Sequence, residues 1–172
     1  MLFCFKNNDI LFRMFVFTLK NNNFKIKLTM HNLERFLPKQ ENDYLTALHE
    51  IKSGLKKTHW IWYIFPQLDG LVAKPSENTR KFSIKNAAEA IAYYKHPILQ
   101  SRLLEITKEL LAHKNKNIQQ IMGEVDSVKL RSCMTLFDYI SGNEISVFRE
   151  ILDQYFSGEV DQKTIEILKK EI

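Results

Sequence analysis

The fold is decided by one nearly unbroken apolar stretch, His59-Trp60-Ile61-Trp62-Tyr63-Ile64-Phe65-Pro66-Gln67-Leu68. Its period alone does not distinguish a strand from a helix. No other segment after residue 30 alternates convincingly, and a lone strand would leave its backbone groups without partners. We therefore predict a buried helix that Pro66 ends. Because this helix is apolar on every side, it belongs in the middle of a bundle.

The rest of the chain after residue 30 favours short helices. Five Gly and four Pro among 172 residues are few for the many turns of an all-β fold. Apolar spacing, caps and stop signals predict helices around Leu33–Leu37, Tyr44–Ile51 with Gly54 as its end, Asn86–Tyr94, Pro97–Leu111, Asp126 to near Gly142, Asn143–Gly158, and onward from Asp161. The sequence thus predicts an all-α, compact multihelical single domain around a buried aromatic helix. Residues 69–84 are predicted to be its long polar loop, and long ordered loops are often functional.

Residues 1–29 differ in composition from the rest. They hold six of the twelve Phe residues, and five basic side chains against Asp9 alone, so +4 of the net charge of +5 lies here. We interpret them as an N-terminal extension outside the fold, with Asn32 capping the first helix of a domain over residues 30–172. A basic, aromatic membrane-surface or targeting peptide is the alternative. Because residues 30–172 are nearly neutral, nucleic acid is an unlikely partner.

The cysteine content and the apolar runs indicate the cellular environment that we expect for the protein. Cys4 and Cys133 cannot form a disulfide framework, and no Cys/His spacing indicates zinc, so we predict no metal and no cofactor. The longest uninterrupted apolar run near the N-terminus, Met14–Leu19, is too short for a membrane span. A soluble protein of the reducing cytoplasm is the expectation.

The candidate functional residues are polar residues that interrupt apolar motifs. These are Lys57, His59, Gln67, Arg102, Lys129 and Ser132. Lys or Arg supplies charge for an anionic group, Ser and Gln orient it, and Trp60 or Trp62 offers a ring for stacking. His59 is the candidate catalytic acid–base group. This set predicts a small-molecule pocket for an anionic or nucleotide-like ligand near the aromatic stretch. No catalytic signature accompanies it, so whether the protein is an enzyme stays open.

Purely structural roles for the same residues are an alternative interpretation. Burial of the four aromatic side chains from Trp60 to Phe65 is worth on the order of 10 kcal/mol before entropy, which explains the stretch as core. His59 and Gln67 would then bond backbone carbonyls, and Arg102 and Lys129 would lie on solvated helix faces. The alternative function is a protein-interaction module without catalysis.

Longer motifs allow comparison with known families. They include Glu34-Arg35-Phe36, Lys57-x-His59-Trp60-x-Trp62-x-Ile64-Phe65-Pro66-Gln67-Leu68-x-Gly70-Leu71, His96-Pro97-x-Leu99, Arg102-Leu103, and Asp126-x-x-Lys129-Leu130-x-Ser132-x-Met134-Thr135-Leu136-Phe137. In these motifs the chain resembles the DUF1810 family of uncharacterised proteins from about Met30 to Leu168. The resemblance implies a compact all-helical fold and no established activity. Some members are labelled calpastatin-like, but inhibitors of that kind are disordered and polar, unlike this chain.

Overall fold

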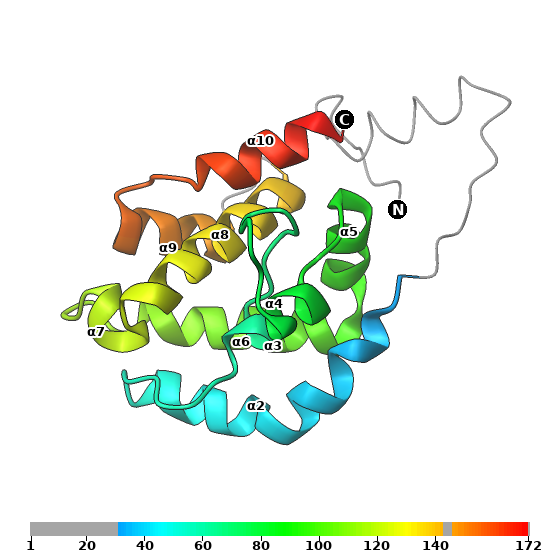
Figure 1. Cartoon of the computed structure of the whole chain (residues 1–172). Helices are drawn as coiled ribbons and strands as arrows, with labels where there is room; N and C mark the ends of the chain where they lie inside the picture. The colour runs from blue at the N-terminus through cyan, green and yellow to red at the C-terminus, as the bar shows by residue number, and fades with distance from the viewer. Residues whose placement is uncertain (1–30, 143–145, 172) are drawn as a thin grey trace, which may run out of the picture.

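The computed structural model describes residues 31–142 and 146–171, which form a bundle of helices (Figure 1). In chain order the elements are the 3₁₀ helix η1 (Leu33–Arg35) and the α-helices α2 (Leu37–Lys52), α3 (Ile61–Ile64), α4 (Glu77–Phe82), α5 (Ala87–Lys95), α6 (Pro97–Leu111), α7 (Ile118–Met122), α8 (Glu124–Ser141), α9 (Val147–Phe156) and α10 (Gln162–Lys170). These ranges contain no strand, only one parallel bridge between Leu68 and Ile84. The predicted all-α fold class is confirmed.

Helix α8 is the central element of the bundle. It packs against α5, α7, α9 and α10, and α6 in turn packs against α2, α5 and α9. The inner side chains of α8, among them Leu130, Cys133 and Phe137, are fully buried. Figure 1 shows α2 along one edge of the molecule and α10 along the opposite edge, with α3 and α4 between them. The aromatic stretch that contains α3 is therefore enclosed by helices distant in sequence.

A continuous series of aromatic contacts joins these elements. Phe137 of α8 lies 5.4 Å from Tyr93 of α5, whose ring meets Phe36 at 5.1 Å, between ring centroids. Phe36 contacts Phe82 of α4 at 5.9 Å, and Phe82 contacts Tyr63 of α3 at 5.2 Å. Such pairs are worth about 0.5–1.5 kcal/mol each beyond their buried area. The aromatic residues thus position α3 against the core.

The predicted helix before Pro66 is only one turn long in the structure. Only Ile61–Ile64 is helical, and Phe65 leaves the helix with φ −119° and ψ 71°. Pro66 ends the helix, as predicted, because a proline disfavours the α conformation in the residue before it. Trp60 and Phe65 are fully buried, as predicted. Trp62 is only half-buried and His59 is exposed, so the stretch is accessible to solvent at these two positions.

Two short helices were missed by the sequence analysis. The predicted loop over residues 69–84 contains α4, which Ser76 caps by accepting a hydrogen bond from the Thr79 N–H at 3.2 Å. The ends of this connection meet where the Ile84 N–H donates to the Gln67 carbonyl at 2.8 Å. Helix α7 begins with a capping box formed by Asn117 and Gln120. Both helices are single turns or little more, too short to show a hydrophobic period.

Several helix starts also differ from the prediction. Pro38 lies in the first turn of α2, where its missing N–H is tolerated, instead of ending a helix. Asn32 precedes η1 but makes no side-chain capping bond. Helix α8 begins at Glu124 after Gly123, so Asp126 is in its first turn and is not its cap. Asn143 and residues 1–29 lie outside the described residues.

Other caps were predicted correctly. The Asn86 side chain accepts from the Glu89 N–H at 2.8 Å at the start of α5, and the Asp161 carboxylate accepts from the Thr164 N–H at 3.3 Å before α10. Pro97 occupies the first turn of α6. Within residues 31–142 and 146–171, no helix combines the length and apolar character that a membrane crossing requires.

Candidate functional site

The segment before α3 is held by one buried carboxylate. Glu50 of α2 is 5% exposed and accepts hydrogen bonds from the Lys57 N–H at 2.8 Å, the Thr58 N–H at 3.1 Å and the Trp60 indole N–H at 2.8 Å. The Thr58 hydroxyl donates to it as well, at 2.8 Å. Burial alone would raise the pKa of the Glu50 carboxyl, but these donors outweigh burial and lower it. Glu50 thereby fixes the position of Trp60.

Asp126, in the first turn of α8, binds two lysine side chains. Lys56 Nζ lies 2.7 Å from one of its oxygens, and Lys129 Nζ lies 2.8 Å from the other. Burial by itself would raise the pKa of the Asp126 carboxyl, but the two ammonium groups outweigh burial and lower it. Two cations therefore share one carboxylate.

Each of these lysines also lies over a tryptophan ring. Lys56 Nζ is 4.8 Å from the Trp60 ring centre, and Lys129 Nζ is 5.0 Å from that of Trp62. An ammonium group over an indole face is attracted by the ring quadrupole. We call Lys56, Asp126, Lys129, Trp60 and Trp62 the tryptophan–lysine cluster.

The two lysines of the cluster differ in access to solvent. The Lys56 side chain is 7% exposed, and its ammonium also donates to the Thr58 carbonyl at 2.6 Å. Lys56 is therefore engaged in holding the segment before α3. The Lys129 side chain is 24% exposed, and its one hydrogen-bond partner among the described residues is Asp126. Lys129 and the half-buried Trp62 thus form the accessible part of the cluster.

The structure brings only some of the predicted site residues together. Trp60, Trp62 and Lys129 meet in the cluster, and Ser132 lies one turn after Lys129 on the same helix face. The Ser132 hydroxyl is buried and donates to the Val128 carbonyl at 3.2 Å. That bond satisfies its donor, leaving only its lone pairs for another group.

Three other predicted residues border the cluster along the chain. Lys57 and His59 are exposed, and the Lys57 bond to Glu50 comes from its backbone, not its side chain. The carbonyl of His59 accepts from the Tyr63 hydroxyl at 3.3 Å. Gln67 is half-buried and uses its carbonyl in the bridge to Ile84. The proposed catalytic role of His59 stays a prediction.

Arg102 makes its contacts elsewhere. Its guanidinium pairs with Glu41 at 2.8 Å and lies over the Tyr44 ring at 5.3 Å, so it bridges α6 to α2. Neither partner belongs to the tryptophan–lysine cluster. Its Nη1 atom is buried without a hydrogen-bond partner among the described residues. The predicted grouping of Arg102 with Lys129 therefore finds no contact to support it.

Three residues of this region were not predicted from the sequence as site residues. Lys56 and Glu50 were not selected as site residues, and Asp126 was interpreted only as a helix cap. The spacing Asp126-x-x-Lys129 offered one signal, since residues three apart meet on a helix surface. Within the described ranges, no three or more His, Cys, Asp or Glu side chains gather in a way that would hold a metal ion.

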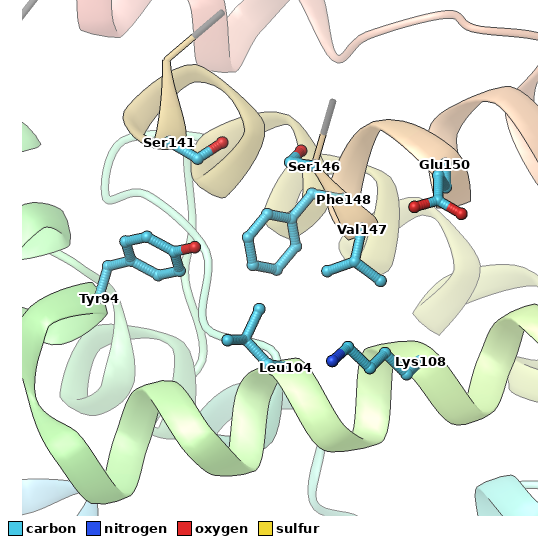
Figure 2. Close-up of a pocket in the computed structure, with 8 residues that line it drawn as sticks. All are labelled: Tyr94, Leu104, Lys108, Ser141, Ser146, Val147, Phe148 and Glu150. Atoms are coloured by element: carbon cyan, nitrogen blue, oxygen red, sulfur yellow. The ribbon is translucent and has the colours of Figure 1, made fainter. Parts of the chain in front are cut away.

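A separate cavity of about 400 Å³ lies between α5, α6, α9 and the end of α8 (Figure 2). Apolar side chains Leu104, Val147 and Phe148 line it, together with Lys108 and Glu150. None of the site residues predicted from the sequence lines this cavity. It is therefore a second candidate site, distinct from the cluster.

Comparison with known proteins gives one family and one similar structure. Residues 30–168 match the profile of a family described as "Protein of unknown function (DUF1810)". The structure is similar to the crystal structure of the conserved hypothetical protein Rv1873 from Mycobacterium tuberculosis, with a TM-score of 0.77 and 34% sequence identity over 81% of this chain and 97% of that one. No curated protein shows significant similarity to the chain.

Proposed function

The chain belongs to the DUF1810 family of proteins of unknown function, and from its own side chains we propose that it binds an anionic, nucleotide-like small molecule at Trp62 and Lys129. The observation that carries this proposal is the position of the Lys129 ammonium, which is 5.0 Å from the centre of a half-buried indole and partly open to solvent. A cation beside an accessible aromatic ring suits a ligand that combines an anionic group with a planar ring.

Charge in the cluster favours an anion over a cation. Asp126 is already shared by Lys56 and Lys129, so its carboxylate has little capacity left for a ligand cation. A phosphate approaching Lys129 gains a charge-assisted hydrogen bond from its ammonium group. Lys57 and His59, both exposed, are the nearest neighbours along the chain that add positive charge or a hydrogen bond. We retain them, with Gln67, as proposed ligand-binding residues.

A ligand panel tests the proposal. AMP, ADP and adenosine are titrated into the full-length protein, and tryptophan fluorescence and the melting temperature are recorded. Trp60 and Trp62 are the only two tryptophans, so the fluorescence reports on this segment. We expect saturable binding of AMP and ADP, and about tenfold weaker binding of adenosine, because it lacks the phosphate. Selective binding also raises the melting temperature.

The matched variants are Lys129→Met and Lys114→Met. Methionine keeps an apolar chain over Trp62 but removes the ammonium, so Lys129→Met should bring the affinity for AMP down to that for adenosine. Lys114 is exposed and has no partner among the described residues, so its variant should bind like the wild type. The proposal is wrong if no nucleotide changes either signal at millimolar concentration, or if both variants bind equally well.

One observation favours the alternative of a protein-interaction module. Val125 and Val128 of α8 are 70% and 56% exposed, and they share a helix face with Lys129. Exposed apolar side chains beside a cation are typical of a partner surface. Val128→Ser separates the two functions, because it removes exposed apolar surface without adding charge, so an interaction module would lose affinity for its partner while nucleotide binding would persist.

A further inference from the structure

The cavity between α5, α6 and α9 has the size of a small-molecule site. Its volume of about 400 Å³ falls within the range that ligand pockets usually show. Figure 2 shows Tyr94 beside Phe148 on its lining, with Leu104 below them. The Tyr94 and Phe148 rings meet at 5.9 Å with an interplanar angle of 67°. One end of the cavity is therefore aromatic and aliphatic.

Two serine hydroxyls at its edge already have partners. The Ser146 hydroxyl donates to the Asp138 carboxylate at 2.8 Å and accepts from the Arg149 N–H at 3.1 Å. The Ser141 hydroxyl donates to the Asp138 carbonyl at 3.0 Å. These serines cap and close helices, so they do not define the ligand.

Two helices each contribute one charged side chain to the lining of the cavity. Lys108 of α6 and Glu150 of α9 both line it, and both are exposed. Among the residues that the structure describes, neither side chain has a salt bridge or hydrogen bond, and they are not paired with each other. Figure 2 shows the Lys108 ammonium turned towards the interior, below Val147, and Glu150 beyond Val147. The lining thus carries one positive and one negative charge, each without a partner.

We propose that this cavity binds a free α-amino acid with an apolar side chain. The ligand carboxylate pairs with Lys108, its ammonium group pairs with Glu150, and its side chain packs on Leu104, Phe148 and Tyr94. A zwitterion matches both charges of the lining at once. A simple anion would leave Glu150 facing its negative charge, and a simple cation would face Lys108 in the same way.

The probe is L-phenylalanine, compared with two analogues that each lack one charge. 3-Phenylpropionate keeps the carboxylate, and phenethylamine keeps the ammonium group. Binding to the full-length protein is measured by calorimetry or by NMR shifts. We expect phenylalanine to bind at least about tenfold more tightly than either analogue, because each lost ion pair removes a charge-assisted hydrogen bond.

Two variants assign the charges. Lys108→Met should weaken phenylalanine and phenylpropionate by about tenfold and leave phenethylamine unchanged, whereas Glu150→Gln should weaken phenylalanine and phenethylamine and leave phenylpropionate unchanged. Both side chains are exposed, so both variants should fold, and their melting temperatures check this. Equal affinity for all three compounds, no binding of phenylalanine, or variants that act on the wrong analogue would overturn the proposal.

This site is independent of the tryptophan–lysine cluster. Lys129→Met should therefore leave phenylalanine binding unchanged, just as Lys108→Met should leave nucleotide binding unchanged. Leu104→Trp fills the cavity floor and supplies a third variant, for which we expect loss of phenylalanine binding with the fold retained. If phenylalanine still binds this variant with wild-type affinity, its site is not this cavity.

Discussion

Glu50 is the residue on which the arrangement before α3 depends. Its buried carboxylate receives three N–H donors and one hydroxyl, from Lys57, Thr58 and Trp60. The Glu50→Gln substitution keeps the size of the side chain but places an NH₂ group against those donors. We expect it to lower the free energy of unfolding by about 3 kcal/mol, because buried donors lose an ionised acceptor. Urea denaturation at neutral pH measures this.

The same residue predicts a pH dependence. Because folding lowers the pKa of Glu50 below its reference value of 4.5, its contribution to stability is fully present above that value and is lost as the pH falls through the folded-state pKa. Glutamine does not titrate. The stability difference between the wild type and Glu50→Gln should therefore be constant from pH 5 to 7 and shrink in more acidic solution.

Glu166 on α10 provides the control for both measurements. It is exposed and has no side-chain partner among the described residues, so Glu166→Gln should match the wild type at every pH. A Glu50→Gln variant that retains wild-type stability at pH 7 would show that the four hydrogen bonds contribute nothing net.

At the scale of elements, α3 is a short helix that depends on contacts with neighbouring helices for its stability. A single turn has almost no intrinsic stability in water. Its Tyr63 carbonyl accepts a hydrogen bond at 2.7 Å from the buried Gln40 amide of α2, which also donates to the Tyr93 hydroxyl at 3.0 Å. Gln40 thus satisfies the carboxyl end of α3 and links it to α5.

Replacing Gln40 with Met should loosen this junction. The two side chains have similar volume, so the main loss is of the hydrogen bonds to Tyr63 and Tyr93 in the core. We expect the free energy of unfolding to fall by about 1–3 kcal/mol, and hydrogen exchange at residues 61–65 to accelerate. Gln119→Met, at an exposed position of α7, should change neither quantity. Unchanged exchange in Gln40→Met would mean that packing alone holds α3.

These elements also show what the sequence could predict. Caps such as Asn86 and Asp161 act within four residues, so their positions were predicted correctly. Pro66 was predicted correctly to end α3, but the start of α3 at Ile61 was not predicted, and α4 was too short to show a hydrophobic period. Local rules therefore predicted the longer helices and missed the single turns.

The candidate site was less predictable for a related reason. Trp62 and Lys129 were both predicted as site residues from their residue types, but their contact joins segments 67 positions apart. Lys56 and Asp126 are also far apart in the sequence, and the residues around each of them do not indicate that the two form a salt bridge. Pairing across the bundle is decided by how α3 packs on α8, which only the structure supplies.

At the scale of the molecule, the buried side chains of the described residues form one cluster from Phe36 to Leu168. We therefore predict that a fragment of residues 30–172 folds cooperatively, with a melting temperature within about 4 °C of the full chain, since 1 kcal/mol shifts the melting temperature of a domain near this size by about 2–4 °C. Thermal unfolding followed by circular dichroism compares the two proteins. Insolubility of the fragment, or a broad transition, would show that residues 1–29 belong to the folded unit.

A deletion at the C-terminus is the control for this comparison of melting temperatures. Removing residues 162–172 takes away α10, whose Leu168 and Thr164 side chains are fully buried against the rest of the core. This deletion should cost about 3 kcal/mol or more, because it exposes to water the face of α8 on which α10 packs and removes the Thr164 donors to the Asp161 carboxylate. If the two deletions were equally harmful, the core would extend beyond Phe36–Leu168. If neither were harmful, α10 would be as dispensable as residues 1–29, and the single-core description would be wrong.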